Sequence, residues 1–271
     1  MRNAKMTIWV VLMLFSIFSE VANAKLEGYV AEGKTVYFTD FETGQQTQIE
    51  LVGLSEQVDY FESFAFSPID DCLYAVGHWD NYLTVGGRQI ERSLYKINPK
   101  TGNVTNNIAF LSSSHGLSNL PALAISSNGT PYAIELTSGG DLYALVDSTG
   151  PEDWIGVTHI GQTPPAIALA INSSDKGILW CADQHFRLLN LSDSTTTEIG
   201  EVTGPFLSLD YSSYGNLYAW GNKTLYQIDV DNLTSVSISS FTYGNAPFAL
   251  VPEPSTLLLL GLGGLMLRKR C

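Results

Sequence analysis

Carboxylates and histidines are the side chains of this sequence that are best suited to chemistry. Asp70, Asp71, Asp80, Asp183 and Asp210 lie where apolar segments end or turn. Two carboxylates that face one cavity can act as acid and base in glycoside cleavage. Aspartate is also frequent in turns, because its side chain caps the turn backbone and tolerates left-handed conformations. We therefore expect no catalytic residue, and we keep as the alternative a polysaccharide-acting hydrolase or lyase that uses Asp71, Asp183 and Asp210.

The histidines show no metal-binding spacing. They are His78, His115, His159 and His185, and none belongs to a His-x-His or His-Glu-x-x-His pair. Cys-x-x-Cys pairs and Asp-rich calcium loops are also absent from the sequence, so neither zinc nor calcium is indicated. No phosphate-binding glycine loop, dinucleotide fingerprint or Gly-x-Ser-x-Gly elbow occurs. The sequence therefore predicts no metal site and no cofactor.

Residues 78–80 are the best candidates for ligand binding. His78 follows the second strand of a predicted hairpin, and Trp79 and Asp80 come directly after it. An indole ring offers a flat apolar face for a sugar, and the polar neighbours offer hydrogen bonds. A lone histidine in a loop is also commonly just solvated, so both interpretations stay open here.

These candidates must be positioned by a repeated β-structure. Four hairpins join an apolar strand, a polar turn and a strand with Tyr or Trp, over residues 64–76, 123–134, 169–182 and 207–220. A second hairpin follows each of them, over residues 93–105, 141–150, 187–199 and 224–236. Side chains alternate with period 2, and no stretch of the body shows a helical stripe. The chain is predicted to be all-β.

Four strands per unit predict the blades of a β-propeller. Residues 26–31, 35–39 and 45–51 resemble the second, third and fourth strands of a further blade. Residues 246–251 can supply its missing first strand, which would close the ring and remove its open edges. We expect five four-stranded blades, one of them composite, in a body that spans residues 25–250. A β-sandwich or irregular β-structure is the alternative.

The composition excludes some partners. Residues 25–251 carry 9 Lys and Arg against 25 Asp and Glu, a net charge of about −16. Nucleic acid is not an expected partner, because phosphate contacts need a basic surface. Cys72 and Cys181 fall in apolar segments of repeats that are two units apart, so we expect buried free thiols rather than a disulfide.

The N-terminal segment is typical of a secretory signal peptide. Arg2 and Lys5 precede an apolar run over residues 7–18, and Ala22 and Ala24 form an Ala-x-Ala cleavage site before Lys25. Residues 1–24 are therefore predicted to be a signal helix that directs the body to the secretion machinery. An uncleaved N-terminal anchor is the alternative.

The C-terminal segment, residues 251–271, has three parts in order. They are Pro252-Glu253-Pro254, an uncharged run from Ser255 to Leu267, and the basic cluster Arg268, Lys269 and Arg270. As a helix, the 13-residue run would span only about 20 Å, which is short for a bilayer. The basic cluster should stay cytoplasmic, which places the body on the other side of the membrane. A plain membrane anchor is the alternative, and the role of Cys271 is open.

These three parts resemble the PEP-CTERM sorting signal of Gram-negative bacteria, also catalogued as an ice-binding protein C-terminal domain. The resemblance implies an exosortase, an integral-membrane peptidase, as a partner, and a link to exopolysaccharide or biofilm matrix. The repeats also resemble those of secreted β-propeller proteins. We expect an exported cell-surface or extracellular protein, held transiently or lastingly by its tail. Its body would be a non-enzymatic propeller that binds extracellular polysaccharide or acts as a scaffold.

Overall fold

The computed structural model describes residues 25–83, 87–110, 117, 119–136, 139–147, 155–242 and 247–251. For residues 80–83, 87–91, 106–110, 147 and 155 it describes the backbone alone. The predicted signal peptide with Ala22 and Ala24, and the tail from Pro252 to Cys271, lie outside the described residues. The described part contains no helix long and apolar enough to cross a membrane.

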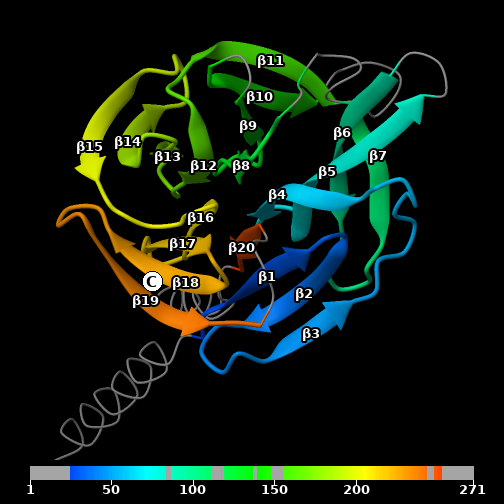
Figure 1. Cartoon of the computed structure of the whole chain (residues 1–271), viewed down its shortest axis with the longest axis horizontal. Coiled ribbons are helices and arrows are strands. Elements are labelled where there is room, and N and C mark those ends of the chain that lie inside the picture. Colours follow the sequence, from blue (N-terminus) through cyan, green and yellow to red (C-terminus); the bar gives the residue numbers. More distant parts are fainter. Residues whose placement is uncertain are drawn as a thin grey trace, which may run out of the picture.

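The described residues form five four-stranded antiparallel sheets arranged as blades around a common axis (Figure 1). Blade 1 holds β4 (Tyr60–Ser67), β5 (Cys72–Leu83), β6 (Gly87–Ile97) and β7 (Val104–Phe110). Blade 2 holds β8 (Ala122–Ile125), β9 (Pro131–Glu135), β10 (Asp141–Asp147) and β11 (Ile155–Gln162). Blade 3 holds β12 (Ala166–Ile171), β13 (Lys176–Cys181), β14 (His185–Asn190) and β15 (Thr196–Glu201). Blade 4 holds β16 (Ser208–Tyr211), β17 (Leu217–Gly221), β18 (Thr224–Asp229) and β19 (Thr234–Ser240). The prediction of an all-β propeller is confirmed.

The fifth blade joins the two ends of the body, as predicted. Its strands are β20 (Phe248–Leu250), β1 (Glu27–Glu32), β2 (Thr35–Asp40) and β3 (Gln46–Ile49), in that order from the centre outward. We call it the closing blade. β20 pairs antiparallel with β1, with Gly28 opposite Leu250 and Val30 opposite Phe248.

The burial of each strand follows its place in a blade. β12 lies innermost, and five of its six residues are buried because it packs against neighbouring blades on both faces. β19 lies outermost, and its residues are exposed or half-buried. The core therefore lies between blades, where Trp220, Phe41 and Phe248 pack with ring centroids 6.1–6.2 Å apart.

Turns between the first two strands of blades 2, 3 and 4 share one backbone conformation. Gly129, Asp175 and Gly215 occupy its left-handed position, with φ of 87°, 56° and 81°. Two of the three turns use glycine, which adopts this conformation without a steric cost. Asp175 instead carries a carboxylate, which accepts hydrogen bonds from the backbone N and the hydroxyl of Ser127 at 2.6 and 2.7 Å. This side chain links blade 3 to blade 2.

Both cysteines of the body are buried free thiols, as predicted. Cys72 opens β5 of blade 1, and Cys181 closes β13 of blade 3. Burial is the first cause of the raised pKa of each thiol. The thiols are therefore packing groups of the core rather than a covalent link between blades.

Candidate functional site

His78 does not lie in a loop. The sequence predicted that β5 ends before it, but β5 continues to Leu83 and pairs with β6 along its whole length. The strand continues because its partner β6 is equally long, although the residues after Gly77 lack a clear apolar alternation. The hairpin formed by β5 and β6 reaches well beyond the edge of the ring in Figure 1.

The side chain of His78 is buried in an ionic cluster that the sequence did not indicate. Its Nδ1 lies 3.2 Å from Glu62 Oε1, and its ring stacks on Tyr60 with centroids 4.4 Å apart. Arg92 donates from Nε and Nη2 to the two carboxylate oxygens of Glu62, at 2.9 and 2.6 Å. The side chains of Glu62, His78 and Arg92 are at most 9% exposed. The imidazole is thus held inside blade 1.

Trp79 is half-buried, and the side chain of Asp80 lies outside the described residues. Successive residues of a strand point to opposite faces of its sheet, so the indole of Trp79 and the imidazole of His78 face opposite sides. A ligand site that combines residues 78–80 remains a prediction, and in β5 it would have to bind on the Trp79 face.

The three carboxylates of the hydrolase alternative lie in different parts of the ring. Asp71 lies in the turn between β4 and β5, where Lys100 pairs with it. Asp183 lies in the turn between β13 and β14. This turn is on the opposite face of the ring, because successive strands run antiparallel. Asp210 lies within the innermost strand β16, not at a strand end as expected. Among the described residues no three His, Cys, Asp or Glu side chains are grouped as a metal site requires.

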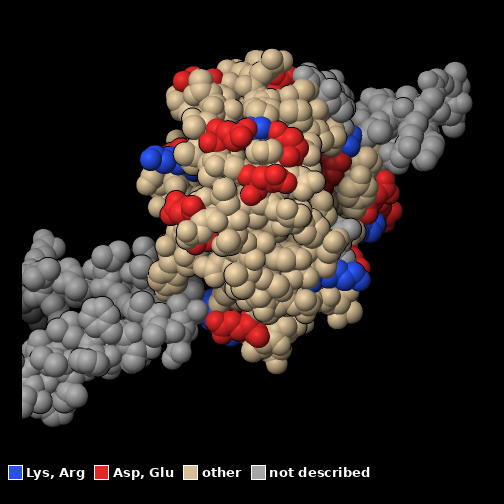
Figure 2. Space-filling view, turned by 60° about the vertical axis from the view of Figure 1, so that its left-hand side comes forward, with Lys and Arg blue, Asp and Glu red and all other residues tan. Residues whose placement is uncertain are grey.

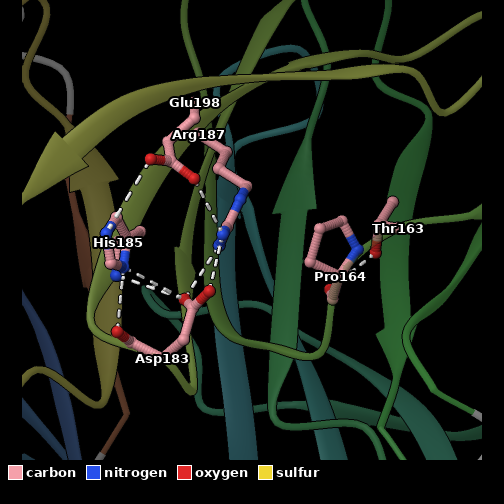
Figure 3. Close-up of polar contacts among 6 residues, drawn as sticks. All are labelled: Thr163, Pro164, Asp183, His185, Arg187 and Glu198. Atoms are coloured by element: carbon pink, nitrogen blue, oxygen red, sulfur yellow. Dashed lines mark hydrogen bonds and ion pairs between the residues drawn. The ribbon is translucent and has the colours of Figure 1, made fainter.

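Asp183 belongs to a polar cluster on the outside of blade 3 (Figure 3). Arg187 donates to both carboxylate oxygens of Asp183, at 2.8 and 2.5 Å, and to Glu198 at 3.2 Å. His185 Nε2 lies 3.8 Å from Glu198. The hydrogen bonds from Arg187 lower the pKa of Asp183 to about 2. Asp183 is therefore ionised at neutral pH and cannot act as a general acid there.

Asp210 is the one of these carboxyls that borders the central channel. Its Oδ2 accepts a hydrogen bond from Leu250 N at 2.7 Å, and its Oδ1 accepts one from Tyr211 N at 2.8 Å. The cavity beside it measures about 20 Å³, enough for about one water molecule, and it lies between the innermost strands β4, β8, β12 and β16. Asp210 as a whole is half-buried, but its carboxyl group is enclosed. Burial raises the pKa of this carboxyl to about 7, although the two backbone hydrogen bonds act to lower it.

This raised pKa predicts a pH-dependent stability. The folded state holds a proton on Asp210 up to about pH 7, whereas the unfolded chain releases it near 3.8. The contribution of this group to stability is therefore full below pH 4 and is lost as the pH rises to 7. We expect the free energy of unfolding of Asp210→Asn, relative to wild type, to increase by about 4 kcal/mol between pH 4 and 8. Urea titrations at both pH values measure this change, and a constant difference would contradict it.

A groove lies between the closing blade and blade 1. It measures about 380 Å³ and is lined by Tyr29, Phe38, Thr47, Gln48, Ile49, Glu50, Pro99, Lys100, Thr101 and Gly102. We call it the inter-blade groove. Burial raises the pKa of Tyr29 to about 12, so its phenol stays neutral and able to donate. The rings of Tyr29 and Phe38 lie 5.5 Å apart, so the groove combines aromatic surface with several hydrogen-bonding side chains.

Comparison with known families assigns the C-terminal tail to a family of sorting motifs. The model of the PEP-CTERM protein-sorting motif matches residues 250–270. The chain carries a PEP-CTERM sorting motif. A PEP-CTERM motif marks an exported protein with a C-terminal membrane anchor, which exosortase recognises and processes. The match includes the predicted sorting residues Pro252, Glu253, Pro254, Arg268, Lys269 and Arg270. It covers a small part of the chain and assigns no activity to the propeller.

Solved structures of other proteins are similar to this chain. A protein of unknown function from Bacteroides caccae is 11% identical, with a TM-score of 0.51 over 84% of this chain and 100% of its own. A gluconolactonase from Xanthomonas campestris is 12% identical, with a TM-score of 0.49 over 71% of this chain and 68% of its own. YCF48 bound to D1 peptide is 13% identical, with a TM-score of 0.43 over 80% of this chain and 64% of its own. No curated protein matches the sequence.

Proposed function

We propose that this PEP-CTERM protein is a non-enzymatic propeller that binds extracellular polysaccharide in its inter-blade groove. The observation that carries the proposal is the lining of that groove. Its volume of about 380 Å³ lies within the range of small-molecule sites, and its walls join two aromatic rings to amide, hydroxyl and charged side chains. Sugars present flat C–H faces and many hydroxyls, which suit such a wall.

The position of the groove also favours a polymer. The groove is open rather than enclosed, and it lies between outer strands of the closing blade and the turn after β6. An open groove admits an internal segment of a long chain, whereas an enclosed pocket would admit only an end. The exposed side chains of Gln48, Lys100 and Thr101 can each donate hydrogen bonds to sugar hydroxyls.

The hydrolase alternative requires two carboxyl groups that flank one bond, about 5–10 Å apart. Asp71 and Asp183 lie in turns on opposite faces of the ring, and each is paired with a basic side chain. Asp210 lies beside a cavity of about 20 Å³, which cannot hold a sugar ring. These positions support a binding function over hydrolysis.

Retention on polysaccharide tests the proposal. We expect the purified protein to be retained on immobilised exopolysaccharide from its own host, and the double variant Gln48→Ala, Lys100→Ala to lose at least about tenfold in affinity, or about 1.4 kcal/mol. Lys176→Ala is the matched control, because Lys176 is exposed on blade 3 away from the groove. Equal retention of all three proteins would contradict the proposed role of the groove in binding. Release of reducing sugar by the wild type would favour the hydrolase.

A further inference from the structure

The two ends of the folded body leave the ring side by side. β20 ends at Leu250 directly opposite Gly28, near the start of β1, and Val251 N donates to Glu27 O at 3.0 Å. The innermost strands all end on the same face, because each is the first strand of its blade and they run in the same direction. Lys25 and Val251 therefore lie on the face that carries the turns after β4, β8, β12 and β16, which we call the exit face.

Very little chain separates this face from the apolar run of the tail. Only Pro252, Glu253 and Pro254 lie between Val251 and the uncharged run that begins at Ser255. Three extended residues span at most about 11 Å. The polar layer on each side of a bilayer is itself about 5–8 Å thick. A body tethered by this segment has no room to stand away from the membrane.

We propose that the exit face rests on the outer surface of the membrane while the sorting tail is inserted. The occupant of this face is then the lipid headgroup layer, to which the tail of the chain holds the ring. The opposite face, with the turns between second and third strands, points away from the membrane. This inference rests on the sorting motif and not on the proposed polysaccharide binding.

The surface beside the exit supports this orientation. Ile69 and Tyr214 are 59% and 45% exposed, and they lie in the turns that follow β4 and β16. β4 and β16 are the two inner strands that pack against β20, so these side chains flank the point where the tail leaves. Tyrosine is enriched at the interface between membrane and water.

The charges beside the exit are also compatible with headgroups. Lys25 pairs with Asp40 at 2.8 Å, Lys96 pairs with Asp70 at 2.6 Å, and Lys100 pairs with Asp71. These pairs offset carboxylates that would otherwise be repelled by anionic lipid. The outer turns of blades 3 and 4 lack such lysines and carry Asp193, Asp229 and Asp231, so the contact should be limited to the region around the exit.

The opposite face stays available to partners, whereas the turn of Lys100, which lines the inter-blade groove, lies beside the membrane until the tail is cut. The opposite face carries the turn of Asp183, near which Arg187 and Glu198 are grouped. Figure 2 shows acidic side chains gathered around a small basic patch on the flank that faces left in Figure 1. A partner in the medium would meet this acidic surface before the protein is released from its tail.

Quenching by lipid probes tests the orientation. The full chain, taken from a strain that lacks its processing peptidase and carrying Cys271→Ser, is placed in phosphatidylcholine–phosphatidylglycerol vesicles with nitroxide on the headgroups. A fluorophore on Ser213→Cys reports the exit face, and one on Lys34→Cys reports the opposite face of the closing blade. We expect the fluorophore at residue 213 to lose at least half of its emission and the one at residue 34 to lose almost none.

A variant with a longer tether distinguishes contact that is held by the tail from chance adsorption to the membrane. Fifteen Gly and Ser residues inserted between Val251 and Pro252 add a reach of about 20 Å. We expect this insertion to restore most of the emission at residue 213. Equal quenching at both positions, or quenching at residue 213 that the insertion does not change, would overturn the proposal. Loss of polysaccharide retention would not affect this readout.

Discussion

A chain that ends at Val251 is expected to melt at the same temperature as the full-length protein, whereas a chain that ends at Pro247 should not fold cooperatively. The difference is β20, whose residues Phe248, Ala249 and Leu250 are at most 3% exposed. Without β20, the edge of β1 is open and the inner wall of the closing blade is missing. Thermal melts followed by circular dichroism, with size-exclusion chromatography, measure both results.

The three residues of β20 contact both the closing blade and blade 4. Phe248 packs on Phe41 and Trp220, and its backbone and that of Leu250 bond to Ser208 and Asp210 of blade 4. Removing one buried phenylalanine side chain costs about 3–5 kcal/mol, a large part of a stability of about 5–15 kcal/mol. Removing the whole strand also removes these hydrogen bonds between the closing blade and blade 4.

A point variant tests the dependence of the fold on β20 without truncation. Phe248→Ala should lose about 3–5 kcal/mol in the free energy of unfolding. Val236→Ala is the control, because Val236 is 62% exposed and surface changes usually stay within about 0.5 kcal/mol. A chain ending at Pro247 that melts like wild type would show that the ring does not depend on its closing strand.

The tail can be cut at the sorting motif without loss of β20. The Pro-Glu-Pro segment begins two residues after β20 ends, so a cut within or after it leaves the closing strand in place. The released product would therefore keep a closed ring. Processing further upstream would remove the strand that closes it.

The fold could be predicted from sequence because its signals are local. Alternation at period 2 and polar turns lie within each hairpin, and the closing blade followed from an incomplete repeat at residues 26–51 and a lone strand at 246–251. The predicted strand 26–31 differs from β1, Glu27–Glu32, by one residue at each end. The predicted second strand of blade 1 was too short, because its continuation past Gly77 is polar and is stabilised mainly by pairing with β6.

The sites could not be predicted, because their residues are brought together only by the fold. Glu62 and Arg92 are 30 residues apart and meet across β5, and neither stands in a recognisable motif. The inter-blade groove joins residues 47–50 to residues 99–102, from different blades. No periodicity reports which turn of one blade faces which strand of the next. The environment of Asp210 depends in the same way on Leu250, 40 residues away.

Removing the carboxylate of Glu62 should strongly destabilise blade 1. Its side chain is 9% exposed and that of Arg92 is 6% exposed, with two hydrogen bonds between them. Glu62→Ala leaves the buried guanidinium without its carboxylate, which typically costs about 3–5 kcal/mol. His78 loses the same partner, which adds to the cost. Urea titration of the purified protein measures the free energy of unfolding.

A second bidentate ion pair provides the control. Arg187 binds both oxygens of Asp183 as Arg92 binds Glu62, but the side chain of Asp183 is 50% exposed. Because solvent screens an exposed pair, Asp183→Ala should cost about 1 kcal/mol or less. The double variant Glu62→Leu, Arg92→Met should recover much of the loss, since no buried charge then remains unpaired. If Glu62→Ala and Asp183→Ala cost the same, burial is not what makes the Glu62–Arg92 pair necessary.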